Sequence, residues 1–123
     1  MTGVLLPEPV RLAAERAERA GFTMSCDPGT GRLPAVLAAA VPANGRVLEL
    51  GTGTGAGTAW ITHGLQGRDD VEVVTVEIDA ATAALAAQHL WPSWVRLLTG
   101  DAREVTRSAG RFDLIFTDAQ GGK

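Results

Sequence analysis

The sequence predicts an α/β domain with a doubly wound, Rossmann-like parallel sheet. From residue 46 onward, apolar strand-like segments alternate with helix-sized intervals, which is the order of parallel βαβ units. The strand cores, such as Val73-Val74 and Leu97-Leu98, are continuous apolar runs, as expected when helices cover both faces of a sheet. A loop dense in glycine follows the first strand, and such loops let a backbone approach a ligand closely.

A first helix is expected over residues 7–20, and Gly21 ends it. Its apolar residues recur every three or four positions, which places them on one face of the helix. The charged residues from Glu15 to Arg19 are assigned to the opposite, solvated face. The residues expected on the apolar face are Val10, Ala13, Ala17 and Ala20.

Turn and breaker residues set the other expected boundaries. Pro42 stops a second helix, which is rich in alanine and leucine. The elements expected after the first helix are a turn over 26–31, helices over 33–41, 56–65, 80–90 and 102–108, and strands over 46–50, 72–77, 95–98 and 112–117.

Length and composition limit the classes of protein to consider. The 123 residues suffice for one domain, with a helical segment over 1–44 and a β/α core over 45–123. The formal net charge of −3 gives no basic excess, so no nucleic-acid partner is expected. No apolar run approaches the roughly 18 residues of a membrane span, so no membrane partner is expected. Cys26 is the only cysteine, and a cytoplasmic location is the simpler interpretation.

The loop Gly51-Thr52-Gly53-Thr54-Gly55 is the first candidate ligand site. It brings backbone close to a ligand and exposes amide donors at the start of the next helix. A tight strand-to-helix turn alone would need only one or two glycines. With the next residue, alanine, the loop also fits the dinucleotide pattern G-x-G-x-x-A, so nicotinamide and other adenosyl cofactors both stay open.

Acidic residues at the strand ends narrow the choice of cofactor. Glu77 lies about 20 residues beyond the glycine loop, where a carboxylate can accept both hydroxyls of a ribose. Glu49 precedes the glycines, where it would repel a pyrophosphate but favour ammonium and sulfonium charges. Asp101 either accepts from an adenine amino group or caps the helix that begins at Ala102. Asp79 is better explained as the cap of the helix over 80–90.

In these segments the chain resembles the class I S-adenosylmethionine-dependent methyltransferases, and within them the small O-methyltransferases of the catechol and caffeoyl-CoA type. The resemblance implies a seven-stranded fold, of which this chain holds the first four strands, and S-adenosylmethionine as the cofactor. Four segments carry it in order: 47–55, 74–79, 100–102 and 112–119.

The resemblance also implies a role for each matching residue. Glu49 and the glycines would surround the methionine part of the cofactor, Glu77 the ribose, and Asp101 with Ala102 the adenine. Asp118 would lie on the substrate side, and Ser25 matches a stretch that closes over the cofactor. The implied cofactor-binding residues are Ser25, Glu49, Gly51, Thr52, Gly53, Gly55, Glu77, Ile78, Asp101, Ala102 and Asp118.

Asp118 is also the single candidate metal ligand. The alternative is that Asp118 is a structural acid at the end of a strand, whose carboxylate is hydrogen-bonded by neighbouring groups. Metal-dependent members of the family continue as Asp-x-x-Lys after the fourth strand, whereas Lys123 stands two residues further on here. Their second metal-binding pair comes from a later strand. A divalent metal site therefore cannot be completed by the residues of this chain, and no catalytic residue is assigned.

The expected function is methyl transfer from S-adenosylmethionine to an oxygen of a small-molecule acceptor, with catalysis mainly by alignment. A nicotinamide-dependent oxidoreductase and a cofactor-binding assembly module without turnover remain as alternatives. The fourth strand would expose an apolar edge that bears Leu114, Ile115 and Phe116. We therefore expect a longer protein of which this is a fragment, or a sheet completed by another chain, as in a homo-oligomer.

Overall fold

The computed structural model describes residues 6–21 and 28–117, and it contains the parallel α/β sheet that the sequence predicts. Helices α1 (Glu8–Ala20) and α2 (Pro28–Ala39) precede the sheet. The strands are β1 (Arg46–Leu50), β2 (Glu72–Glu77), β3 (Val95–Thr99) and β4 (Leu114–Thr117), and the helices between them are α3 (Ala56–Gly64), α4 (Ala80–Ala86) and α5 (Ala102–Ser108).

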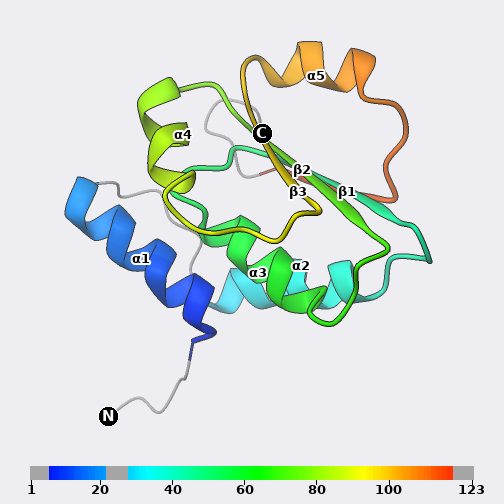
Figure 1. Ribbon diagram of the computed structural model, residues 1–123, viewed down its shortest axis with the longest axis horizontal. Helices are drawn as coiled ribbons and strands as arrows, with labels where there is room; N and C mark the ends of the chain where they lie inside the picture. Colours follow the sequence, from blue (N-terminus) through cyan, green and yellow to red (C-terminus); the bar gives the residue numbers. More distant parts are fainter. Residues whose placement is uncertain (1–5, 22–27, 118–123) are drawn as a thin grey trace.

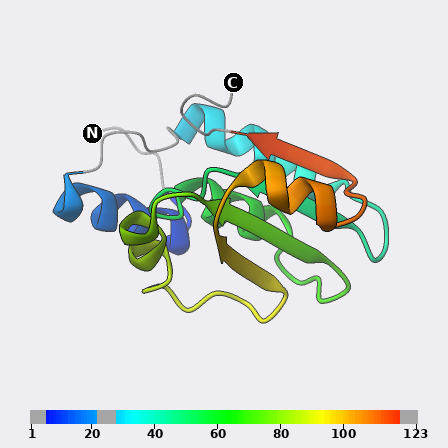
Figure 2. The same cartoon turned by 90° about the horizontal axis from the view of Figure 1, so that it is seen from above.

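The strands lie in the order β3-β2-β1-β4, and all neighbours are parallel (Figures 1 and 2). The chain runs outward from β1 to β3 and then returns to the other side of β1. Leu48 accordingly pairs with Val74 on one side and with Ile115 on the other. This reversal between β1 and β4 is a topological switch point, and open α/β sheets bind ligands beyond the carboxyl ends of the strands there.

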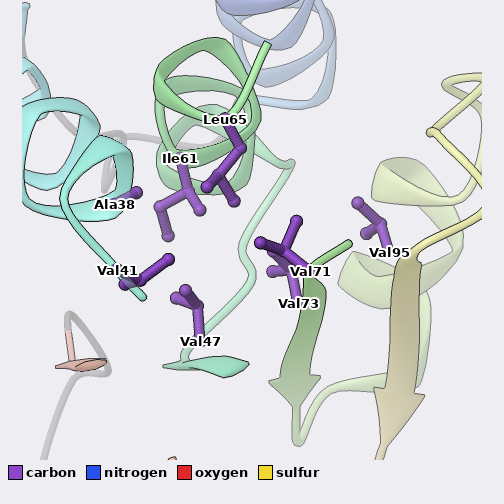
Figure 3. Close-up of a cluster of buried hydrophobic side chains, with 8 residues drawn as sticks. All are labelled: Ala38, Val41, Val47, Ile61, Leu65, Val71, Val73 and Val95. Carbon is purple, nitrogen blue, oxygen red and sulfur yellow. The ribbon is translucent and has the colours of Figure 1, made fainter. Parts of the chain in front are cut away.

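Helices cover both faces of the sheet, as a doubly wound fold requires. Figure 1 shows α2 and α3 on one side and α5 on the other. On the first face, Val47 and Val73 point toward Ile61 of α3 and Leu65, the residue that follows this helix (Figure 3). On the second face, the buried side chains of Leu48, Val74 and Val76 meet the half-buried side chains of Val105 and Phe112. The central strands are thus buried on both sides, which explains their continuous apolar sequence.

Several predicted boundaries differ from the structure. Helix α2 begins at Pro28 instead of residue 33, so the predicted turn is wrong for residues 28–31; proline suits a first helical position because its φ is already helical. Helix α4 ends at Ala86 instead of residue 90, where the indole N–H of Trp91 donates to the Ala86 carbonyl at 2.9 Å. Strand β4 begins at Leu114 instead of residue 112.

Helix α1 ends as predicted, but its buried face differs from the prediction. Gly21 adopts the left-handed conformation (φ 69°), and its N–H donates to the carbonyls of Ala17 and Glu18. Ala20, expected on the apolar face, is exposed. Arg16, expected in solvent, is only 5% exposed. The assignment of Arg16 to a solvated face is therefore wrong, and the reason lies in its contact with the glycine loop described below.

Strand β4 forms one edge of the sheet in the described part of the chain, as expected. Ile115 is 56% exposed, whereas Leu114 and Phe116 are half-buried against the core. The apolar edge is therefore real but smaller than the sequence suggested. None of the described helices combines the length and the apolar character that a membrane crossing needs.

Candidate cofactor site

The glycine loop between β1 and α3 owes its shape to glycines in conformations that other residues rarely adopt. Gly51, Gly53 and Gly55 have φ values of 98°, 58° and 102°. The N–H of Gly51 donates to the carbonyl of Val76 at 2.8 Å, and the N–H of Gly55 donates to the carbonyl of Thr52 at 3.0 Å. The loop is thus fixed to the end of β2 and turns directly into α3.

Glu77 lies against this loop at the end of β2. One carboxylate oxygen accepts from the N–H of Gly53 at 2.9 Å, and the other accepts from the N–H of Asp79 at 3.0 Å. The two oxygens of a carboxylate offer about four acceptor positions, so about two remain for a ligand. Because the side chain is half-buried, the arrangement suits two neighbouring hydroxyls, as on a ribose.

Glu49 lies beneath the loop, where its side chain is 1% exposed. Its carboxylate accepts from the hydroxyl of Thr58 in α3 and, at 2.7 Å, from the hydroxyl of Thr75 in β2. The Thr75 hydroxyl also lies 2.6 Å from that of Thr52 in the loop. A Cβ on Gly57 would collide with the Glu49 carboxylate, so α3 can approach β1 this closely only with glycine there. Glu49 therefore braces the strand, the loop and the helix.

Asp79 and Asp101 both cap helices, as the sequence suggested for Asp79 and left open for Asp101. Asp79 accepts from the N–H of Thr82 at 2.8 Å, and Asp101 accepts from the N–H of Arg103 at 2.8 Å. Hydrogen bonds from Thr82, first through its hydroxyl, lower the pKa of Asp79. The backbone hydrogen bond from Arg103 is the largest influence that lowers the pKa of Asp101. Both carboxylates are held in the ionised form.

The end of β3 is joined to the same edge of the sheet. The N–H of Gly100 donates to the backbone carbonyl of Glu77 at 2.9 Å, which brings Asp101 and Ala102 into the neighbourhood of Glu77. The side chain of Ile78 is 75% exposed and directly follows Glu77. Of the predicted site residues, the structure thus gathers those from positions 49–55, 77–78 and 101–102 along one edge.

Ser25 and Asp118 lie outside the described residues, and so does Cys26. Within residues 6–21 and 28–117, no group of three histidine, cysteine, aspartate or glutamate side chains could hold a metal ion. The predicted role of Asp118 toward a metal therefore stays a prediction.

The sequence did not identify Arg16 as a site residue. Its Nε and Nη2 atoms donate to the carbonyl of Thr54 at 3.1 and 3.0 Å. Burial, and then the charge of Arg19, lower the pKa of Arg16. A signal was available, because Arg16 stands three residues after Ala13 and one before Ala17, inside the apolar stripe of α1.

A cavity of about 660 Å³ lies apart from this edge, between α2 and α3. Trp60 and His63 of α3 line it together with Arg32 of α2, and the rings of Trp60 and His63 meet edge to face at 6.1 Å. The other lining residues are Leu6, Pro7, Ala35, Val36, Ala39 and Gly64. None of the predicted cofactor-binding residues that the structure describes lines this cavity.

The chain belongs to a family of methyltransferase domains. The model of the methyltransferase-domain family matches residues 48–121, a span that includes the glycine loop, Glu77 and Asp101. "Probable O-methyltransferase Rv1220c" of Mycobacterium tuberculosis is 37% identical over 114 residues, which are 87% of this chain and 49% of that protein. The chain spans about half the length of the curated relatives it matches.

Solved structures show the same fold. The O-methyltransferase TomG of Streptomyces achromogenes, involved in tomaymycin synthesis and crystallised with SAM, superposes with a TM-score of 0.81 at 26% identity, over 96% of this chain and 56% of that chain. Cofactor-bound Rv0187 from MTB gives a TM-score of 0.78 at 28% identity, over 94% and 55%. The superposition on TomG confirms the predicted methyltransferase fold, of which the described residues hold a four-stranded parallel sheet.

Proposed function

We propose that the full-length protein transfers a methyl group from S-adenosylmethionine to an oxygen of a small-molecule acceptor. The observation that carries this proposal is the hydrogen bond from the Gly53 N–H to the Glu77 carboxylate. It joins the glycine loop, which follows β1 at the switch point of the sheet, to the carboxylate at the end of β2 that we propose to bind the ribose. Family membership supports it, and so does TomG, which was crystallised with SAM.

The proposed roles follow the order of the strand ends. Glu77 accepts the two ribose hydroxyls through its remaining acceptor positions. The loop residues Gly51, Thr52, Gly53 and Gly55 lie along the methionine part, and the carboxylate of Glu49 beneath them favours its positive charges. Ile78 offers an exposed apolar side chain to the adenine, next to Asp101 and Ala102.

The described residues bind and orient; none of them is proposed to form a covalent bond. Bound S-adenosylmethionine supplies a methyl group that is already electrophilic, because it is attached to a sulfonium. The protein then accelerates transfer mainly by aligning the acceptor oxygen with that methyl group. Ser25 over the cofactor and Asp118 on the acceptor side, with or without a divalent metal, complete the proposal outside the described residues.

The remaining proposals concern organisation and surroundings. We propose that residues 1–123 belong to one cofactor-binding domain, and that the exposed edge at Ile115 is covered by the rest of a longer chain or by a second copy. The single cysteine and the net charge of −3 support a cytoplasmic protein without nucleic-acid partners.

Calorimetric titration of the full-length protein with S-adenosylhomocysteine and, separately, with NADH tests the proposal. We expect S-adenosylhomocysteine to bind and NADH not to bind at comparable concentrations. Binding of NADH alone would replace the proposal by an oxidoreductase. Binding of S-adenosylhomocysteine without methyl transfer to any of a panel of hydroxylated acceptors would point to the assembly module instead.

A further inference from the structure

Helix α1 is hydrogen-bonded to the glycine loop at a single residue, Thr54. The guanidinium of Arg16 donates to the Thr54 carbonyl from both Nε and Nη2, at 3.1 and 3.0 Å. The hydroxyl of Thr54 donates in return to the carbonyl of Ala13 at 3.3 Å. These hydrogen bonds join residues that are 38 and 41 positions apart. They therefore fix the loop to a helix that precedes all strands of the sheet in the sequence.

Arg16 occupies a costly position. Its side chain is 5% exposed, and no carboxylate of the described residues lies within ion-pair distance of it. The charged groups near it are Arg19, whose charge lowers the pKa of Arg16, and His89, whose pKa is lowered by its own burial and then by the charge of Arg16. A buried guanidinium held by a carbonyl contributes less to stability than an apolar side chain could. Stability alone therefore does not explain Arg16.

The geometry of the loop shows what Arg16 controls. A peptide group directs its C=O and N–H to opposite sides, so holding the Thr54 carbonyl orients the Gly55 N–H, which donates to the Thr52 carbonyl at 3.0 Å. A Cβ on Gly55 would stand 3.1 Å from Arg16 Nη2 and 2.8 Å from the indole of Trp91. Arg16 and Trp91 thus pack against Gly55, in the same turn whose Gly53 N–H donates to Glu77.

We propose that Arg16 is a positioning residue that couples the docking of α1 to cofactor binding, an inference that rests on the proposed function. Because Arg16 holds the carbonyl of Thr54, the loop keeps the conformation that binds the cofactor. Because coupling between two equilibria is reciprocal, a bound cofactor stabilises the docked position of α1 by the same factor. Arg16 touches the loop and not the reacting atoms, so it is not a catalytic residue.

The test compares Arg16→Met with Arg19→Met in the full-length protein; Arg19 is an exposed arginine one turn further along the same helix. Hydrogen exchange of the loop amides 53–56 without ligand is the first measurement, and it does not depend on the proposed function. We expect Arg16→Met to speed this exchange about tenfold and to weaken S-adenosylhomocysteine binding about tenfold, as loss of a charged hydrogen bond does. Arg19→Met should change neither.

The second measurement is the exchange of the α1 amides with and without S-adenosylhomocysteine. S-adenosylhomocysteine should slow the exchange of the α1 amides in the wild type but not in Arg16→Met. If Arg16 were purely structural, the ligand would not have different effects on the two proteins. Arg16→Lys keeps the charge but offers one nitrogen in place of the Nε and Nη2 pair. Its exchange rates and affinity should fall between those of the wild type and Arg16→Met, and it carries the test if Arg16→Met does not fold. Loop exchange unchanged in the folded variant, or equal effects of the Arg16 and Arg19 variants, would overturn the proposal. A wild type that binds no S-adenosylhomocysteine refutes the proposed function, while loop exchange still tests Arg16.

Discussion

Replacement of Glu77 by glutamine should weaken binding of S-adenosylhomocysteine while the protein stays folded. The carboxylate already accepts the N–H groups of Gly53 and Asp79 at 2.9 and 3.0 Å. Glutamine keeps one oxygen, and its NH₂ group must face one of these two N–H donors. The variant therefore loses acceptor capacity at the position where the ribose hydroxyls are proposed to bind.

The magnitude follows from the charge of the carboxylate. A hydrogen bond to a charged group contributes about 1.5–3 kcal/mol, and each 1.36 kcal/mol corresponds to a factor of ten, so the dissociation constant should rise about 10- to 150-fold. Isothermal titration calorimetry of the full-length protein measures this ratio directly. A 2′-deoxy analogue of the ligand should lose affinity for the wild type but much less for Glu77→Gln, because the partner of its missing hydroxyl is already absent.

The matched control is Asp79→Asn, two residues further along. Asparagine caps helices about as well as aspartate, so this variant removes a nearby carboxylate and keeps the cap. Its affinity for S-adenosylhomocysteine should stay within about twofold of the wild type. A Glu77→Gln variant that binds as the wild type does, or an equal loss in Asp79→Asn, would refute the assignment of Glu77 to the ribose.

Three further outcomes are expected. Gly64→Ala should lower Tm by about 4–12 °C, because the new Cβ would overlap the backbone carbonyl of Ala35 and overpacking costs about 1–3 kcal/mol; a Tm within about 2 °C of wild type would contradict this close helix contact. The hydrogen bond from Arg68, and then the one from the Asn44 N–H, hold the pKa of Asp70 below its usual range. The ionised carboxylate therefore stabilises the fold above about pH 4, and this stabilisation is lost as the pH falls. The Tm difference between wild type and Asp70→Asn should shrink below that pH, and a difference that grows would show the opposite sign of linkage. Asp101→Ser should keep the helix cap and the Tm but weaken S-adenosylhomocysteine binding about 2- to 10-fold; unchanged affinity would leave Asp101 as a cap alone.

The order of strands and helices was predictable because burial on both faces leaves a strong local signal. Apolar runs such as Val73-Val74 and the glycines after residue 50 identify strands and their ends without knowledge of tertiary contacts. The ends of helices were less predictable. Helix α4 ends at Ala86, whose carbonyl accepts the N–H of His89 and the indole N–H of Trp91, and the spacing of apolar residues does not show these contacts.

The site was predictable where topology alone gathers residues. The carboxyl ends of parallel strands meet at one edge, so the proximity of the glycine loop, Glu77 and Asp101 followed from their positions after strands. The role of Arg16 was not predicted, because a charged residue on a helix is usually solvated. Its burial depends on the packing of α1 against a loop 38 residues away.

A crystal structure of the full-length protein with S-adenosylhomocysteine tests the central claim most directly. We expect both ribose hydroxyls within about 3.2 Å of the Glu77 carboxylate oxygens, with the homocysteine part along the loop from Gly51 to Gly55. A ligand bound elsewhere, such as in the cavity lined by Trp60 and His63, or a ribose without contact to Glu77, would contradict the account.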